Sequence, residues 1–206
     1  MIAIIDYGVG NLFSLTSSFK AIGADVTVTN DESIIKKADK IVLPGVGAFG
    51  DAADKLRSTG LDKAVITEAN SGKPLLGVCL GMQLLLDKSF EFGEHYGLGL
   101  IPGEIRPISE SITPDLKIPQ IGWNSLDFTG EKSPLFKYIK NGDFVYFVHS
   151  YHGVNCESNT IATTSYGGTL TAAVARKNIF ACQFHPEKSG SVGLNILRAF
   201  CEMEAL

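Results

Sequence analysis

The first half of the chain alternates short runs of aliphatic and β-branched residues with segments of helical periodicity. The runs at residues 1–6, 25–29, 40–43 and 74–78 are expected strands, and the segments at 11–22, 31–38, 51–69 and 80–86 are expected helices. A break in the third helix is expected near Gly60. Strands that alternate with helices form βαβ units, which build a mainly parallel sheet with helices on both faces.

After about residue 88 the pattern changes to short β-rich segments separated by Gly, Pro and Ser. Expected strands lie at residues 101–108, 121–128, 143–149, 160–165, 170–175 and 179–184, and a final helix at 190–203. No stretch has the composition of a linker. The sequence therefore predicts a single flavodoxin-like α/β domain over residues 1–206, with a central, mainly parallel sheet that extra antiparallel strands from the second half make mixed.

Composition and charge argue against several kinds of protein. A chain of 206 residues with a net charge of −4 is acidic, which does not favour a nucleic-acid or anionic-membrane surface. Its apolar runs are far shorter than the ~20 residues of a membrane span, and residues 1–8 lack the basic region of a signal peptide. The four cysteines form no CxxC pair, so we expect reduced thiols in the cytoplasm and no metal site.

Glycine makes up 22 of the residues, and one cluster, GVGAFG at 45–50, satisfies the G-x-G-x-x-G pattern after an expected strand. One interpretation is a dinucleotide-binding loop. Pro44 intrudes between strand and loop, however, and the segment about twenty residues on is expected to be helical, without the acidic residue that such a site uses. We favour a tight loop whose backbone N–H groups line a site for an anion or an oxyanion.

Cys79 lies where an expected strand meets an expected helix, in the sequence GVCLG. This is the cysteine version of the G-x-S-x-G nucleophile elbow, in which the nucleophile occupies a strained turn. Glycines at 77 and 81 let the neighbouring backbone pack closely, and the helix that follows favours a thiolate and a developing oxyanion. Cys79 is therefore the candidate nucleophile, and the other three cysteines are expected to be structural.

A thiol nucleophile needs a base and a group that orients the base. His185 and Glu187 stand two residues apart in an extended segment, so their side chains share one side. The carboxylate is then able to fix the imidazole tautomer and to stabilise the imidazolium. His149 is the second candidate base, His152 is a further candidate or a wall of the site, and His95 is expected in a solvated loop.

The sequence resembles the triad-type (class I) glutamine amidotransferases through GVCLGMQ at 77–83 and QFHPE at 183–187. Within that family it is similar to the glutaminase subunits of imidazole glycerol phosphate synthases. That similarity extends over DYGVGN at 6–11, PGVGAFGDA at 44–52, GLGLIPG at 97–103, IPQIGWN at 118–124, YFVHSY at 146–151 and HPEKS at 185–189. The resemblance covers essentially the whole chain.

The resemblance implies that Cys79, deprotonated by His185, attacks the carboxamide of glutamine and forms a glutamyl thioester that water hydrolyses. It implies no cofactor. The backbone N–H of Leu80 and that of Val46 or Gly47 would hold the oxyanion, and the oxyanion hole is expected to stay unformed until a partner signals. The resemblance also implies that Gln83, Ser150 and Tyr151 bind the polar groups of the substrate.

The family resemblance implies a (β/α)₈-barrel cyclase as the partner in a heterodimer, because the glutaminase uses up the chain and ammonia must pass to another polypeptide. That cyclase makes imidazole glycerol phosphate and an aminoimidazole carboxamide ribotide in histidine biosynthesis. Trp123, Asn124, Tyr146 and Lys188 match positions that face the partner. One departure is visible, since Gln120 stands where the family usually has His.

Besides a nucleotide-binding module that would use the loop at 45–50, two alternative functions remain open on sequence alone. The first is a cysteine hydrolase or peptidase on a similar fold, which the elbow and a histidine would also allow. The second is a paralogous glutaminase subunit that supplies ammonia to a different synthase.

Overall fold

Parallel strands form the centre of the fold in the computed structural model, which describes residues 1–205. Their order across the sheet is β2 (Val26–Thr29), β1 (Ile2–Ile5), β3 (Lys40–Leu43), β4 (Leu75–Val78) and β14 (Ile179–Cys182). The first four come from the N-terminal half, and β14 comes from near the C-terminus to pair with β4. This is the flavodoxin-like order, and it brings the residues after β14 next to the turn after β4.

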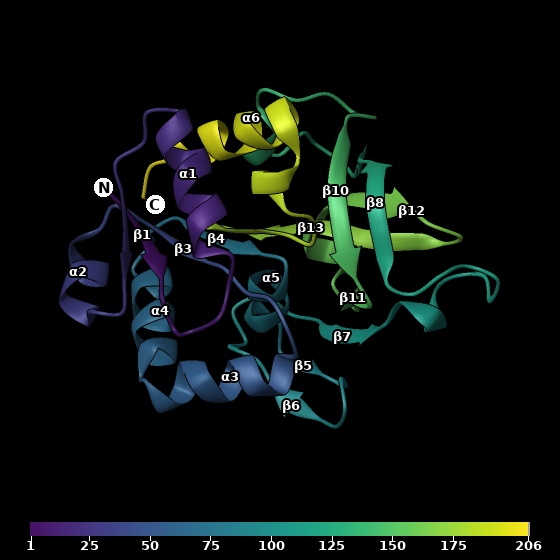
Figure 1. Cartoon of the computed structure of the whole chain (residues 1–206), viewed down its shortest axis with the longest axis horizontal. Helices are drawn as coiled ribbons and strands as arrows, with labels where there is room; N and C mark the ends of the chain where they lie inside the picture. The colour runs from purple at the N-terminus through teal and green to yellow at the C-terminus, as the bar shows by residue number, and fades with distance from the viewer. Residues whose placement is uncertain (206) are drawn as a thin grey trace.

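Helices cover both faces of this sheet (Figure 1). On one face lie α1 (Leu12–Ala21) and α6 (Gly190–Cys201), and on the other α2 (Glu32–Lys37), α3 (Phe49–Ser58), α4 (Leu61–Asn70) and α5 (Leu80–Leu85). Alternation along each strand explains the two layers, because Ile2 and Ile4 pack against α1 and α6 whereas Ala3 and Ile5 pack on the opposite side.

The second half extends the sheet and adds two smaller ones. Antiparallel β13 (Thr169–Arg176), β12 (Thr160–Ser165) and β9 (Asp127–Phe128) follow β14, so the sheet is mixed as expected. A separate hairpin-like sheet pairs β8 (Gln120–Ser125) with β10 (Phe144–His149), and a third contains β11 (Tyr151–Val154), β7 (Glu104–Pro107), β5 (Lys88–Ser89) and β6 (His95–Tyr96). Short 3₁₀ turns lie at Ile108–Glu110, Pro134–Phe136, Glu157–Asn159 and Pro186–Lys188.

The structure differs from the sequence expectations mainly in its shortest elements. The expected break in the third helix is confirmed at Gly60, whose φ of +76° ends one helix and begins the next. The expected strand at 121–128 is interrupted at Leu126, and β5, β6 and β11 were not expected. His95 lies in β6 rather than in a solvated loop, and its ring packs against Gly50. Within residues 1–205, no helix is long and apolar enough to cross a membrane.

Candidate functional site

Cys79 occupies a strained turn between β4 and α5. Its φ of +54° and ψ of −112° are outside the regions that a non-glycine residue usually adopts. The backbone N–H of Cys79 donates to the Cys182 carbonyl at 2.8 Å, which holds the turn to β14. A Cβ on Gly81 would overlap the carbonyl oxygen of Leu43, so this position needs glycine. The elbow therefore depends on the close approach of β3, β4 and α5.

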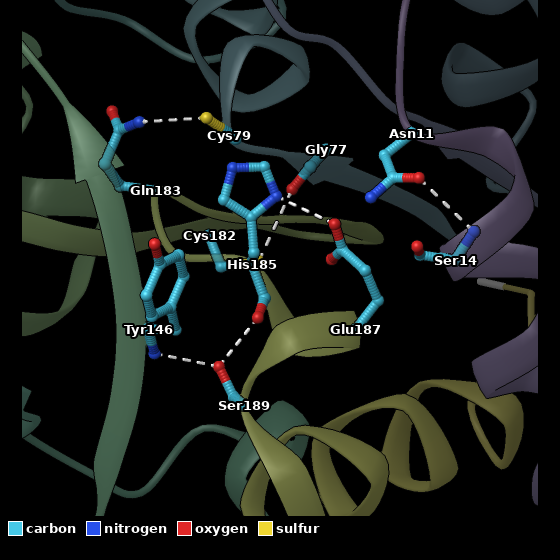
Figure 2. Close-up of polar contacts among 10 residues, drawn as sticks. All are labelled: Asn11, Ser14, Gly77, Cys79, Tyr146, Cys182, Gln183, His185, Glu187 and Ser189. Carbon is cyan, nitrogen blue, oxygen red and sulfur yellow. Dashed lines mark hydrogen bonds and ion pairs between the residues drawn. The ribbon is translucent and has the colours of Figure 1, made fainter. Parts of the chain in front are cut away.

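His185 lies shortly after β14, which ends at Cys182, and is fixed by its own backbone (Figure 2). Its N–H donates to the Tyr146 carbonyl at 2.9 Å. The Ser189 hydroxyl donates to the His185 carbonyl at 2.6 Å and accepts from the Tyr146 N–H at 2.9 Å. The imidazole is thereby held beside Cys79 at the carboxyl ends of β4 and β14, where open α/β sheets place their sites.

The imidazole of His185 lies between Cys79 and Glu187 (Figure 2). Its Nδ1 is 2.8 Å from Oε1 of Glu187, and both side chains are almost fully buried. Burial opposes the charged imidazole, but hydrogen bonding to Cys79 and Glu187 and the attraction of their negative charges outweigh it, so the pKa of His185 is raised to about 9. A charged imidazole stabilises a thiolate on Cys79.

The raised pKa of His185 predicts that the folded protein loses stability as pH rises. The pKa is about 9 in the folded state and 6.5 in the reference state, so the contribution is complete below pH 6.5 and is lost as the pH rises through about 9. We expect this loss to be on the order of 3 kcal/mol. Urea unfolding at several pH values checks it. This loss of unfolding free energy with rising pH should be absent in His185→Gln. The same dependence of unfolding free energy on pH in both proteins would contradict it.

A cavity of about 360 Å³ opens in front of Cys79. It is lined by Val46, Gly47, Cys79, Leu80, Gln83, Glu91, Pro119, Val148, His149, Ser150, Tyr151, His185 and Lys188. The structure thus brings together the candidate nucleophile, base, oxyanion and substrate residues of the sequence analysis, and the 45–50 loop forms one wall. Glu187 lies behind His185 rather than on the wall. A larger hollow of about 470 Å³ near Arg176 contains none of these residues.

Two residues of the site were missed by sequence reasoning. Glu91 lines the cavity and its carboxylate accepts from the N–H of Phe49 at 2.6 Å, at the start of α3. It lies in a loop after a two-residue strand, so no periodic pattern marks it. Gln183 is fully buried and its amide donates to Sγ of Cys79 at 3.7 Å. Its position two residues before His185, on the same side of an extended segment, is the signal that could have identified it.

Gln83 is engaged within the protein as well as facing the cavity. Its Nε2 donates to the Tyr151 carbonyl at 3.2 Å and to Oε1 of Gln183 at 3.0 Å. Both amide hydrogens are therefore used, and only Oε1 is available to a substrate.

The other two candidate histidines have poor properties for a base. Burial, followed by repulsion from His185, lowers the pKa of His149 to about 4, and both of its ring nitrogens face protein groups. His152 does not line the Cys79 cavity. Its Nδ1 accepts from the Thr171 N–H at 3.4 Å and its Nε2 is 2.9 Å from the Ser111 hydroxyl, while burial and then the His149 charge lower its pKa to about 4.

Of the four residues expected at a partner surface, Lys188 lines the cavity, and Tyr146 and Trp123 follow it outward on one face of the β8–β10 pair. Trp123 is about half exposed on β8 and meets Tyr146 of β10 edge-to-face, with ring centroids 6.1 Å apart. Nζ of Lys188 lies 5.8 Å from the Tyr146 ring centroid, and Lys188 also lines the cavity. Asn124 follows Trp123 along β8, but its side chain lies on the opposite side of the strand, where it bonds Gln120. The outer face of the β8–β10 pair is therefore continuous with the mouth of the site.

Comparisons with known proteins agree over nearly the whole chain. The model of the family described as glutamine amidotransferase class-I matches residues 3–203. The imidazole glycerol phosphate synthase subunit HisH of Wolinella succinogenes is 46% identical over 205 residues, which cover 98% of this chain and 100% of that protein. The subunit of the same name from Sulfurimonas denitrificans is 48% identical over 208 residues, with 100% of each chain covered.

Solved structures of low identity share the fold. A crystal structure of glutamine amidotransferase has a TM-score of 0.75 and 16% identity, covering 98% of each chain. PurLQS from Thermotoga maritima has a TM-score of 0.75 and 18% identity, covering 97% of this chain and 96% of that one. At these identities the likeness supports the fold alone.

Proposed function

The chain belongs to the class I glutamine amidotransferases, and we propose that it hydrolyses glutamine with Cys79, His185 and Glu187 and passes the ammonia to a cyclase subunit of imidazole glycerol phosphate synthase in histidine biosynthesis. The observation that carries this proposal is the placement of Cys79 in a strained elbow, beside an imidazole that a buried carboxylate orients. End-to-end relatives named as HisH subunits support the choice of glutaminase over another cysteine hydrolase.

In the first step, the Cys79 sulfur attacks the carboxamide carbon of glutamine. His185 already carries the proton of the thiol, as its raised pKa favours, and gives it to the leaving nitrogen, so the C–N bond breaks and ammonia departs. A glutamyl thioester remains on Cys79. The Glu187 carboxyl group lies 2.8 Å from Nδ1 of His185 and occupies that nitrogen, so that Nε2 is the nitrogen that exchanges protons with sulfur and substrate.

In the second step, water attacks the thioester with His185 as the general base. The C–S bond breaks, the Cys79 sulfur regains a proton, and glutamate leaves. The net reaction consumes one glutamine and one water and gives one glutamate and one ammonia.

The charges on the cavity wall fit the polar end of glutamine. Glu91 supplies a carboxylate for the substrate ammonium group, and Lys188 supplies an ammonium for its carboxylate. The free Oε1 of Gln83 and the Ser150–Tyr151 segment complete the polar wall. We propose that these groups bind the end of glutamine that does not react.

The oxyanion would be held by the N–H of Leu80, at the start of α5, and by that of Val46 or Gly47. Gly47 has a φ of +95°, which alanine adopts only with strain, although its Cβ would meet no atom within 4 Å. We expect Gly47→Ala to lower kcat by ~10²-fold or more through loss of one donor. Gly142→Ala is the matched control, since Gly142 has a φ of +87° and equal space outside the site. Equal kcat values for the two variants would contradict this role.

A separate cyclase subunit is the proposed acceptor of ammonia, with residues 1–206 acting as one glutaminase unit in a heterodimer. The exposed apolar side chains of the β8–β10 pair, which include Trp123, Ile121 and Phe144, support a protein partner on this face. Four free cysteines support a reducing compartment, and we therefore place the complex in the cytoplasm.

We expect Trp123→Ala to weaken cyclase binding by about 2 kcal/mol, a ~30-fold rise in Kd, because a buried tryptophan is a typical anchor of an interface. Tyr96→Ala removes an aromatic side chain that is similarly exposed on β6 and is the matched control. Calorimetric titration with the cyclase subunit measures both. Equal Kd values for Trp123→Ala and the wild type would place the interface elsewhere.

The function is tested by measuring glutamate release and cyclase product together. Wild-type chain mixed with the cyclase subunit should form one glutamate for each imidazole glycerol phosphate. Glutamate release without coupling to this cyclase would favour the paralogous alternative, in which another synthase takes the ammonia. Failure to release glutamate with any such partner would overturn the glutaminase proposal itself.

A further inference from the structure

A row of side chains on the inner side of the β8–β10 pair connects the exposed residue Ser165 to the Cys79 cavity. Asn124 Nδ2 donates to the Ser165 carbonyl at 3.1 Å, and Gln120 Nε2 donates to Asn124 Oδ1 at 2.8 Å. Gln120 Oε1 is 2.8 Å from Nε2 of His149, and Nδ1 of His149 is 2.7 Å from the Tyr151 carbonyl. We call the side chains of Asn124, Gln120 and His149 the relay.

The relay has one hydrogen too few unless His149 is charged. Both of its ends are carbonyl oxygens, which only accept, and each amide has one donating and one accepting end. If Asn124 donates to Ser165, its oxygen faces Gln120, and the oxygen of Gln120 then faces His149. All four contacts are satisfied only when both nitrogens of His149 carry hydrogen, that is, in the imidazolium form.

The surroundings of His149 oppose that charge. Its side chain is 6% exposed, and burial followed by repulsion from His185 lowers its pKa to about 4. The titratable groups that share its cavity are Cys79, Glu91, Tyr151, His185 and Lys188, and His152 is coupled to it from β11. At neutral pH His149 is therefore neutral, and one of the four contacts lacks a hydrogen.

The missing hydrogen costs least at the outer end of the relay. With the amides outward, the contact without hydrogen is the one between Nδ1 of the buried His149 and the Tyr151 carbonyl, whereas with the amides inward it lies at Ser165, which is exposed and open to water. Rotating both amides by 180° exchanges their oxygen and nitrogen positions. The amides then donate inward, Gln120 to Nε2 of His149, and Nδ1–H of His149 donates to Tyr151.

We propose that Gln120 and His149 are positioning residues whose relay holds the Tyr151 carbonyl against the glutamine cavity, and that its direction is set by what Asn124 meets at its exposed end beside Ser165. A group that accepts a hydrogen bond from Asn124 there turns both amides outward, moves the His149 hydrogen to Nε2 and removes the donor from Tyr151. The Tyr151 carbonyl then keeps only its bond from Gln83. The proposal rests on the proposed function, since it takes glutamine as the ligand of this cavity.

The test uses Asn124→Asp, because a carboxylate accepts at both ends and forces the relay outward. The ¹⁵N shifts of the His149 ring in the isolated chain report which nitrogen carries hydrogen. At neutral pH we expect Nδ1–H in the wild type and Nε2–H in Asn124→Asp. Ser125→Asp places the same charge one residue further along β8, outside the relay, and should keep Nδ1–H. The same tautomer in the wild type and Asn124→Asp would overturn the proposal, as would an imidazolium in the wild type.

A kinetic readout separates positioning from a general loss of structure. With the cyclase subunit at saturation, Asn124→Asp and Gln120→Met should raise the KM for glutamine about fivefold, with kcat within about twofold of the wild type. A fivefold change corresponds to ~1 kcal/mol. A loss confined to kcat, or an equal rise in KM for Ser125→Asp, would overturn the positioning role.

The two sets of outcomes are independent. The expected tautomers in a chain that does not hydrolyse glutamine would leave the relay in place and reject the proposed function. Normal glutamine hydrolysis with one tautomer in all variants would reject the relay and leave the function standing.

Discussion

Cys79→Ala is expected to abolish glutamine hydrolysis, with kcat lowered by ~10⁴-fold or more, because no other group in the cavity is placed to form the thioester. The variant should still fold, since alanine removes only the sulfur atom. It should also still bind glutamine, because the polar wall formed by Glu91, Lys188 and Gln83 is untouched.

Cys201→Ala is the matched control for this experiment. Cys201 is a free, partly exposed cysteine at the end of α6, far along the chain from the elbow. Glutamate release in the presence of the cyclase subunit is the measurement. If Cys79→Ala hydrolyses glutamine at the wild-type rate, Cys79 is not the nucleophile.

Gly81→Ala is expected to damage the fold as well as the activity. The new Cβ would overlap the Leu43 carbonyl oxygen, so β3 and α5 would have to separate. We expect a loss of about 3 kcal/mol or more in unfolding free energy and a displaced Cys79. This cost is a large part of the net stability of a domain.

Gly153→Ala is the control for the steric argument. Gly153 is buried in β11, and its added Cβ would come no closer than 3.3 Å to the Cys156 sulfur. Urea unfolding of both variants is the measurement. Equal losses would show that the close approach at Gly81 does not restrict the elbow.

The parallel half of the fold was predictable because its signals are local. Runs such as 40–43 and 74–78 are strands that are buried on both faces, and the glycine at 60 divides two helices as expected. The short strands β5 and β6 have only two residues each and form because tertiary pairing completes their hydrogen bonds. A strand of two residues is too short to produce a recognisable periodic pattern in the sequence.

The candidate site likewise contains some residues that the sequence identifies and others that only the structure reveals. Cys79, His185 and Glu187 stand in recognisable spacing, so the amino-acid sequence alone is enough to select them, although their catalytic roles stay predictions. Glu91 reaches the site because of the path of its loop, and Gln183 because it is buried beside Cys79. Neither feature is evident from the sequence alone. The choice of His185 over His149 gains physical support from their opposite pKa shifts.

The β-rich half of the chain connects the proposed catalytic elbow with the proposed partner surface. The β10 strand holds the backbone of His185 through Tyr146 and also presents the Tyr146 ring to Trp123 on the outer face. The proposed catalytic base and the proposed cyclase surface are therefore both in contact with β10. A displacement of β10 by a partner would be transmitted directly to His185.

The proposed reaction depends on a glutamyl thioester at Cys79, which mass spectrometry of the acid-quenched complex during turnover detects directly. The chain, mixed with its cyclase subunit and glutamine, should gain one glutamyl group on the peptide that contains Cys79. The adduct should be absent in Cys79→Ala. Glutamine turnover without any adduct, or with the adduct on another residue, would contradict the thioester mechanism.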